Sequence, residues 1–157
     1  MDVPFIPPRC GEKDVGFASA FASTPYTVAL PEEGPAAASE LGAVYDCGGK
    51  ARRLEFRSGV HVGLDVNTIA DPGAAWERLV STEEGFARAE GRPNIYSVGT
   101  VQGVPALLID PEAVPNDDAN GGVTFVADGV YVSVGGDGQI PLSDLVKVAE
   151  AIHVSAR

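Results

Sequence analysis

The dipeptide Asp128-Gly129 limits the folds open to this chain more than any other feature of its sequence. Asp-Gly tolerates the positive φ angles of a two-residue type I′ turn, and the segments on either side, VTFVA and VYVSV, are typical of paired β-strands. Because a two-residue loop fixes the register, Phe125 is expected opposite Val132. Alternate residues then form one apolar face: Val123, Phe125, Ala127, Val130, Val132 and Val134. The opposite face is mixed: Thr124, Val126, Tyr131 and Ser133.

An amphipathic helix is predicted after this hairpin. Ser143 stands where an N-cap residue is expected, and Lys147 and Glu150 fall on the polar side of the helix. The apolar side comprises Leu145, Val146, Ala149 and Ile152. We expect this side to cover the apolar face of the hairpin.

The remaining segments predict an antiparallel sheet with a second helix. Strands are expected at residues 26–30, 41–46, 51–57, 60–66, 95–101 and 104–109, with Ser58-Gly59 as the hairpin turn between the third and the fourth. A short helix is expected within residues 14–23, and a longer one of about four turns from Asp71. The core face of the longer helix would carry Trp76, Leu79, Val80 and Phe86.

Eight strands joined mostly by short turns favour an α+β fold, a curved antiparallel β-sheet covered by a middle and a C-terminal helix. The 157 residues are enough for a single domain, 1–157, with a Pro-rich extended arm at residues 1–12.

Charge excludes one class of partner. The chain has 22 acidic and 11 basic residues, a formal charge of -11, which repels nucleic-acid phosphates. Lys50, Arg52 and Arg53 form a weak basic cluster, interpreted as a solvated strand edge. No transmembrane segment is expected, because no apolar run approaches the roughly 20 residues that a membrane helix needs. The first residues also lack the pattern of a signal peptide, which leaves open whether a signal or a lipid anchor has been removed.

The two cysteines, Cys10 and Cys47, are neither in a Cys-x-x-Cys pair nor near a histidine, which argues against zinc or thioredoxin-like chemistry. A disulfide between them would stabilise the fold by roughly 3 to 4 kcal/mol and hold down the loop-rich N-terminal part. Two free thiols are the alternative. A bridge would favour an exported protein.

Candidate site residues are few. Asn116, Asp118 and Asn120 follow the ligand spacing at the start of an EF-hand calcium loop, but Ala127 stands where the bidentate Glu is required. A solvated turn is therefore the preferred interpretation. His61 is expected in a strand, and His153 at the last turn of the closing helix. No nucleophile motif accompanies either histidine, so neither a catalytic residue nor a cofactor is assigned.

Several segments together resemble a known family. They are Thr24-Pro25-Tyr26 with Leu30-Pro31, VQGVPALLI at residues 101–109, the hairpin at 123–134 and LSDLVKVAEAI at 142–152. Over residues 24–154 the chain is similar to an uncharacterised domain family found in extracytoplasmic parts of bacterial lipoproteins and of membrane-anchored, anti-sigma-factor-like proteins. The resemblance implies an exported, tethered domain and brings no catalytic residues. This chain departs from the family in showing no membrane anchor.

These observations predict a non-enzymatic extracytoplasmic binding, sensory or scaffold domain at the bacterial cell envelope, whose partner is a protein or a small apolar ligand. One alternative is a carrier of an apolar or lipid ligand, enclosed between the sheet and the helix that bears Trp76. Another is an unrecognised hydrolase. An apolar cavity beneath that helix would favour the carrier, and a flat closed core would favour the scaffold. His, Asp and Ser side chains that converge in a cleft would favour the enzyme.

Overall fold

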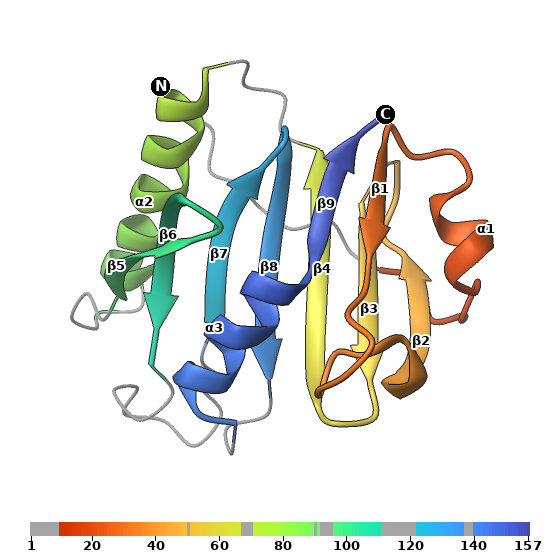
Figure 1. Cartoon of the computed structure of the whole chain (residues 1–157). Coiled ribbons are helices and arrows are strands. Elements are labelled where there is room, and N and C mark those ends of the chain that lie inside the picture. The colour runs from red at the N-terminus through yellow and green to blue at the C-terminus, as the bar shows by residue number, and fades with distance from the viewer. Residues whose placement is uncertain are drawn as a thin grey trace.

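The computed structural model describes residues 10–49, 51–66, 71–89, 91, 96–110, 122–136 and 140–157. Its main element is an open seven-stranded antiparallel sheet in the order β2-β3-β4-β8-β7-β6-β5, and β1 pairs with β9 in a separate two-stranded sheet (Figure 1). The strands are β1 (Tyr26–Ala29), β2 (Leu41–Asp46), β3 (Arg52–Phe56), β4 (Val60–Val66), β5 (Tyr96–Val101), β6 (Val104–Ile109), β7 (Gly122–Ala127), β8 (Val130–Gly136) and β9 (His153–Ala156). The helices are α1 (Phe17–Phe21), η1 (Ala38–Glu40), α2 (Pro72–Ala89) and α3 (Leu142–Ala151). The predicted α+β fold is thereby confirmed.

The hairpin of β7 and β8 has the predicted register. Asp128 and Gly129 both have positive φ, 50° and 81°, and Phe125 pairs with Val132. Val123, Phe125, Val132 and Val134 are almost fully buried, on what we call the first face of the sheet. The second face is the opposite side, which carries Thr124, Tyr131 and Ser133.

The first face is closed by α3 and by the β1–β9 ribbon, which lie in front of the sheet in Figure 1. Leu145, Ala149 and Ile152 are buried there as predicted, and Val148 joins them. Strand β1 contributes Tyr26, which is 1% exposed. This layer and the first face form one continuous apolar core.

The second face is covered only in part. Helix α2 contacts β6 and β7, where Ala75, Leu79 and Ala87 are buried. Trp76 and Val80 are half-buried, so the predicted core face of this helix is only partly correct, and the Phe86 side chain lies outside the described part. Among the described helices, none is long and apolar enough to cross a membrane. In the β2-β3-β4 half, the described helix with a contact of similar extent is α1, against β2. It belongs to the first-face side, where the carbonyl of its Ala20 accepts from Arg52.

Three local predictions are corrected at the chain's two ends. The first helix is limited to Phe17–Phe21, because Gly16 just before it has a φ of 77°. Helix α3 starts at Leu142 after Pro141 with no side-chain cap, so Ser143 is not the N-cap. The helix ends at Ala151, and His153 is the first residue of β9 rather than part of the last helical turn.

Two further predictions concern the N-terminal half. Strand β3 lies between β2 and β4, so the basic cluster is not at a strand edge, and Arg52 is buried with only 5% exposure. Lys50 lies outside the described residues. Of the predicted arm, residues 10–12 are neither helix nor strand, while residues 1–9 are not described.

Candidate functional site

A pocket of about 240 Å³ opens on the second face, in the half that α2 leaves uncovered. It lies over β3, β4 and β8 and against the disulfide. Its lining residues are Cys10, Cys47, Ala51, Arg52, Arg53, His61, Gly63, Leu64, Asp65, Tyr131 and Ser133. The strand pairing explains how these side chains come together.

Gly63 is the centre of the pocket floor. In the sheet register it pairs with Arg53 on β3 and with Ser133 on β8. His61 and Asp65 lie two residues before and after it on β4, so their side chains leave the sheet on the same face. Four polar side chains therefore surround a residue that has no side chain of its own.

The floor stays open because of a second glycine. A Cβ atom on Gly135 would lie 2.3 Å from Cε1 of His61, so the imidazole ring occupies the space directly over Gly135. A Cβ atom on Gly63, in contrast, would meet only the Cβ of Ser133, at 3.8 Å. His61 is thus seated over β8, and the space above Gly63 remains empty.

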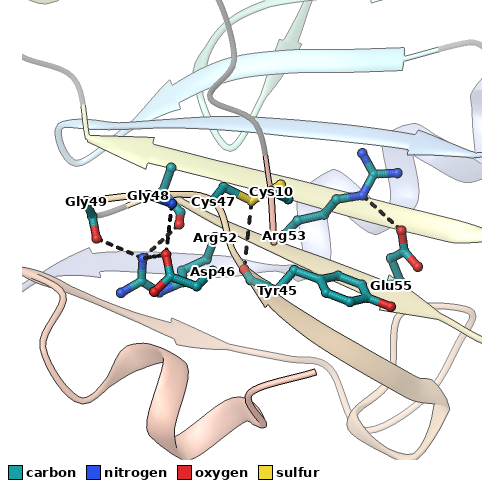
Figure 2. The surroundings of a disulfide bond; sticks show 10 residues. Cys10, Tyr45, Asp46, Cys47, Gly48, Gly49, Arg52, Arg53 and Glu55 are labelled. Carbon is teal, nitrogen blue, oxygen red and sulfur yellow. Dashed lines mark hydrogen bonds and ion pairs between the residues drawn. A yellow bond between two sulfur atoms is a disulfide. The ribbon is translucent and has the colours of Figure 1, made fainter. Parts of the chain in front are cut away.

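The disulfide Cys10–Cys47 forms one wall of the pocket. Figure 2 shows the residues around its two sulfur atoms. Cys47 directly follows β2, and its N–H donates to the carbonyl of Ala51 at 3.0 Å. On the other chain segment, the N–H of Gly11 donates to the carbonyl of Asp46 at 2.8 Å. Both cysteines are thereby held against the end of the β2–β3 pair, and the predicted disulfide is confirmed.

The segment after Cys10 is fixed to β2 by one carboxylate. Asp14 accepts hydrogen bonds from the N–H of Val44 and of Gly16, both at 3.0 Å. These two donors hold the pKa of Asp14 below its ordinary value. The wall of the pocket therefore rests on an anchored chain segment.

Arg52 and Arg53 leave β3 on opposite sides, as seen in Figure 2. Arg52 turns to the first face, where Nε donates to Ala20 at 2.7 Å and Nη1 donates to Gly49 at 2.9 Å and to Ala51 at 2.8 Å, all to carbonyl oxygens. Arg53 turns to the second face, and its Nε donates to Oε1 of Glu55 at 3.0 Å. Within the described ranges, no hydrogen bond involves its two terminal nitrogens, and its side chain is 40% exposed.

The far side of the pocket is set by Asp65 and Tyr131, which pair across β4 and β8. Loss of water raises the pKa of the Asp65 carboxyl, and the N–H of Val66 and the charge of Arg78 on α2 oppose this shift. Burial also raises the pKa of Tyr131, against the charge and a hydrogen bond of Arg78. Helix α2 thus places a cation beside this end of the pocket.

The pocket holds His, Asp and Ser side chains, but they do not form a catalytic triad. His61 and Asp65 are four residues apart on one strand, which spans about 13 Å, so the carboxylate cannot accept from the imidazole. The hydroxyl of Ser133 shares a hydrogen bond of 2.9 Å with Thr124 on β7. This arrangement can hold a ligand by charge and hydrogen bonding.

The other predicted site residues lie elsewhere or outside the description. His153 is exposed on β9, on the ribbon that covers the first face. Asn116, Asp118 and Asn120 belong to residues that the structure does not describe. For the rest of the chain, no cluster of three His, Cys, Asp or Glu side chains is placed to hold a metal ion.

The pocket was not predicted from sequence, although Cys10, Cys47, Arg53 and His61 were singled out there for other reasons. No motif marks four of the lining residues: Arg53, Gly63, Asp65 and Tyr131. The available signal was the alternation along each strand, because each of these residues points to the opposite face from its buried neighbours. That signal shows which face a residue takes. It does not show that the face is uncovered.

Comparison of the chain with protein-family models, with curated proteins and with solved structures finds no match in any of the three. The resemblance to an extracytoplasmic domain family stays a prediction.

Proposed function

We propose that this protein is a non-enzymatic binding domain outside the cytoplasm, at the bacterial cell envelope, and that the pocket over Gly63 is its ligand site. The observation that carries the proposal is the construction of that pocket. Three strands and a disulfide place polar side chains around a floor without side chains, on the half of the sheet that α2 leaves open. Small-molecule sites are typically concave, preformed and provided with a few placed polar groups.

Binding is favoured over catalysis by the distances within the pocket. A hydrolase of the Ser-His-Asp type needs its base within hydrogen-bond reach of both partners. Here Asp65 lies four positions after His61 on one strand, and the serine shares its hydrogen bond with Thr124. The pocket therefore supports a role in recognition.

The location outside the cytoplasm is supported by the disulfide, because such bonds persist in oxidising compartments. The resemblance to envelope proteins supports the same location. A carrier with an apolar ligand under the Trp76 helix is less favoured, because the pocket lining includes charged side chains and not Trp76.

The test is native mass spectrometry of the protein purified gently from its own source, with a pocket-filling variant beside it. Gly63→Val adds a side chain to the pocket floor with only an ordinary contact at its Cβ, and valine suits a strand. Gly122→Val is the matched control on the same face, since its Cβ would meet only the carbonyl of Val134 at 3.5 Å and it does not line the pocket.

We expect a small-molecule mass adduct on the wild type and on Gly122→Val, and its loss in Gly63→Val. Retention of the adduct in Gly63→Val would place the ligand elsewhere and contradict the proposal. Thiol labelling of the same sample gives the compartment: Cys10 and Cys47 should resist alkylation before reduction in an envelope or secreted fraction.

A further inference from the structure

We propose that the pocket recognises a small monocarboxylate with a compact apolar body, whose carboxylate is held by the two terminal nitrogens of Arg53. This inference rests on the proposed function and specifies the class of its ligand. It follows from the donors of Arg53, the charges around them and the apolar part of the pocket.

The guanidinium group of Arg53 is the feature that would bind the carboxylate. Arginine offers five N–H donors in a rigid fork, and the edge formed by its two terminal nitrogens matches a carboxylate. In Arg53 the bond to Glu55 uses Nε, no hydrogen bond within the described ranges takes the two terminal nitrogens, and the residue lines the pocket. The adjacent Arg52 shows the opposite state, because three carbonyls and Asp46 accept from it.

The charges around Arg53 limit the charge of the ligand. Glu55 already compensates part of the Arg53 charge, at 3.0 Å, and at the far side of the pocket the charge of Arg78 acts on the carboxyl of Asp65. A dianion such as phosphate is best held by several cations or by free backbone N–H groups. The strands β3, β4 and β8 use their backbone groups in the sheet ladder. One arginine fork therefore suits a singly charged, planar anion, and a carboxylate is the common one.

The space beside Arg53 limits the size of the ligand's apolar body. The disulfide and Ala51 form apolar surface next to the floor at Gly63. The volume of about 240 Å³ exceeds the roughly 150 Å³ at which an apolar protein cavity already binds benzene. A ring-sized body therefore fits while its carboxylate reaches Arg53.

The test uses benzoate as the probe and benzyl alcohol as its uncharged counterpart, added to the full chain with its disulfide intact at constant ionic strength. Two-dimensional amide NMR follows the signals of Gly63 and Ser133 and gives dissociation constants. The variants are Arg53→Gln, which removes the charge, and Arg53→Lys, which keeps the charge and removes the fork. Arg57→Gln is the control, because Arg57 is exposed just after the opposite end of β3 and does not line the pocket.

We expect saturable shifts at Gly63 and Ser133 with benzoate, and at least about tenfold weaker binding of benzyl alcohol. Arg53→Gln should weaken the binding of benzoate at least about tenfold, and Arg53→Lys should weaken it by less. Arg57→Gln should leave the affinity for benzoate unchanged. Folding of each variant is checked by the unchanged amide spectrum of the α3 residues.

Two results would overturn the inference, and they differ in what they say of the proposed function. If both probes bind equally, Arg53→Gln has no effect and Gly63→Val abolishes both, the pocket is a ligand site but not for carboxylates. If neither probe shifts the pocket amides of the folded protein, the carboxylate inference is rejected, and the adduct on Gly63→Val in native mass spectrometry still decides whether the pocket is the ligand site.

Discussion

The two faces of the sheet are formed by the same strands, but they are completed in different ways. The first face meets α3 and the β1–β9 ribbon, and its central side chains, such as Phe125 and Val132, are 0% exposed. The second face meets α2 over β6 and β7, and over β3 and β4 it keeps polar side chains around Gly63.

Arg52 and Arg53 show the same difference between adjacent residues. Arg52 points to the first face and is 5% exposed, whereas the Arg53 side chain points to the second face and is 40% exposed. On the closed face a charged group must satisfy its donors internally, because an unpaired buried charge is costly. On the open face it can keep donors for a ligand. The comparison teaches that the strand positions facing away from the covering layer are the ones available for recognition.

The largest expected effect tests the closed face. Phe125→Ala removes a fully buried ring and should lower the free energy of unfolding by about 3 to 5 kcal/mol. Tyr45→Ala, a truncation of similar size at a half-buried position on the open face, should cost only about 1 kcal/mol. Urea denaturation monitored by circular dichroism measures both. Equal losses would show that the two faces do not differ in packing.

The next effect compares the two arginines. Arg52→Met leaves the carbonyls of Ala20, Gly49 and Ala51 without this donor and should cost about 3 kcal/mol. Arg53→Met should change stability by no more than about 0.5 kcal/mol, because its ion pair is exposed. Urea denaturation measures both variants. A larger loss of stability in Arg53→Met than in Arg52→Met would show that Arg53, and not Arg52, stabilises the fold.

A third prediction concerns Tyr26 in the closed layer. Burial raises the pKa of Tyr26 from 10.0 to about 12, more than the charge of nearby Arg52 lowers it. The folded state therefore keeps a proton that the unfolded state loses, and stability should fall by about 2 to 3 kcal/mol as the pH rises from 10 to 12. Phenolate absorbance of the wild type against Tyr26→Phe identifies the group. Titration of Tyr26 near pH 10 would contradict its burial.

The smallest effect belongs to the pocket. Desolvation raises the pKa of Asp65 above 3.8, so the folded state binds the proton more tightly and ionisation weakens the fold as the pH rises through the folded pKa. Asp65→Asn should therefore stabilise the protein at neutral pH by less than about 1 kcal/mol, because the group is partly exposed and screened. The gain should disappear near about pH 3, where both states of the wild type are protonated. A loss of stability at neutral pH would point to a structural ion pair instead.

The hairpin and its apolar face could be predicted from sequence because both are local. Asp128-Gly129 sets the turn, and the alternation of Phe125 and its neighbours sets the face. Strand β9 was missed because it follows Ile152 directly after the helix, and its partner is distant in sequence: Thr27 contacts Ser155, 128 residues away. Nothing in four residues of this composition indicates such a pairing.

The site was less predictable, since it depends on register and on what is left uncovered. A two-residue loop at Ser58-Gly59 would pair Phe56 with His61, whereas the structure pairs Glu55 with His61. That one-residue difference places the histidine on the polar face. The alternation along the strand also predicts that Arg52 shares a face with Leu54. Only in the folded chain do the carbonyls of Ala20 and Ala51 accept from the guanidinium group, which allows an arginine to be buried there.

The ribbon of β1 and β9 has a consequence for the order in which the molecule is assembled. Its first strand leaves the ribosome long before the second exists, because the Thr27–Ser155 contact must wait for 128 further residues. Until β9 has been synthesised, the apolar first face of the sheet lacks part of its cover. Closure of such distant contacts is slow, so the nascent domain stays unfinished through most of translation.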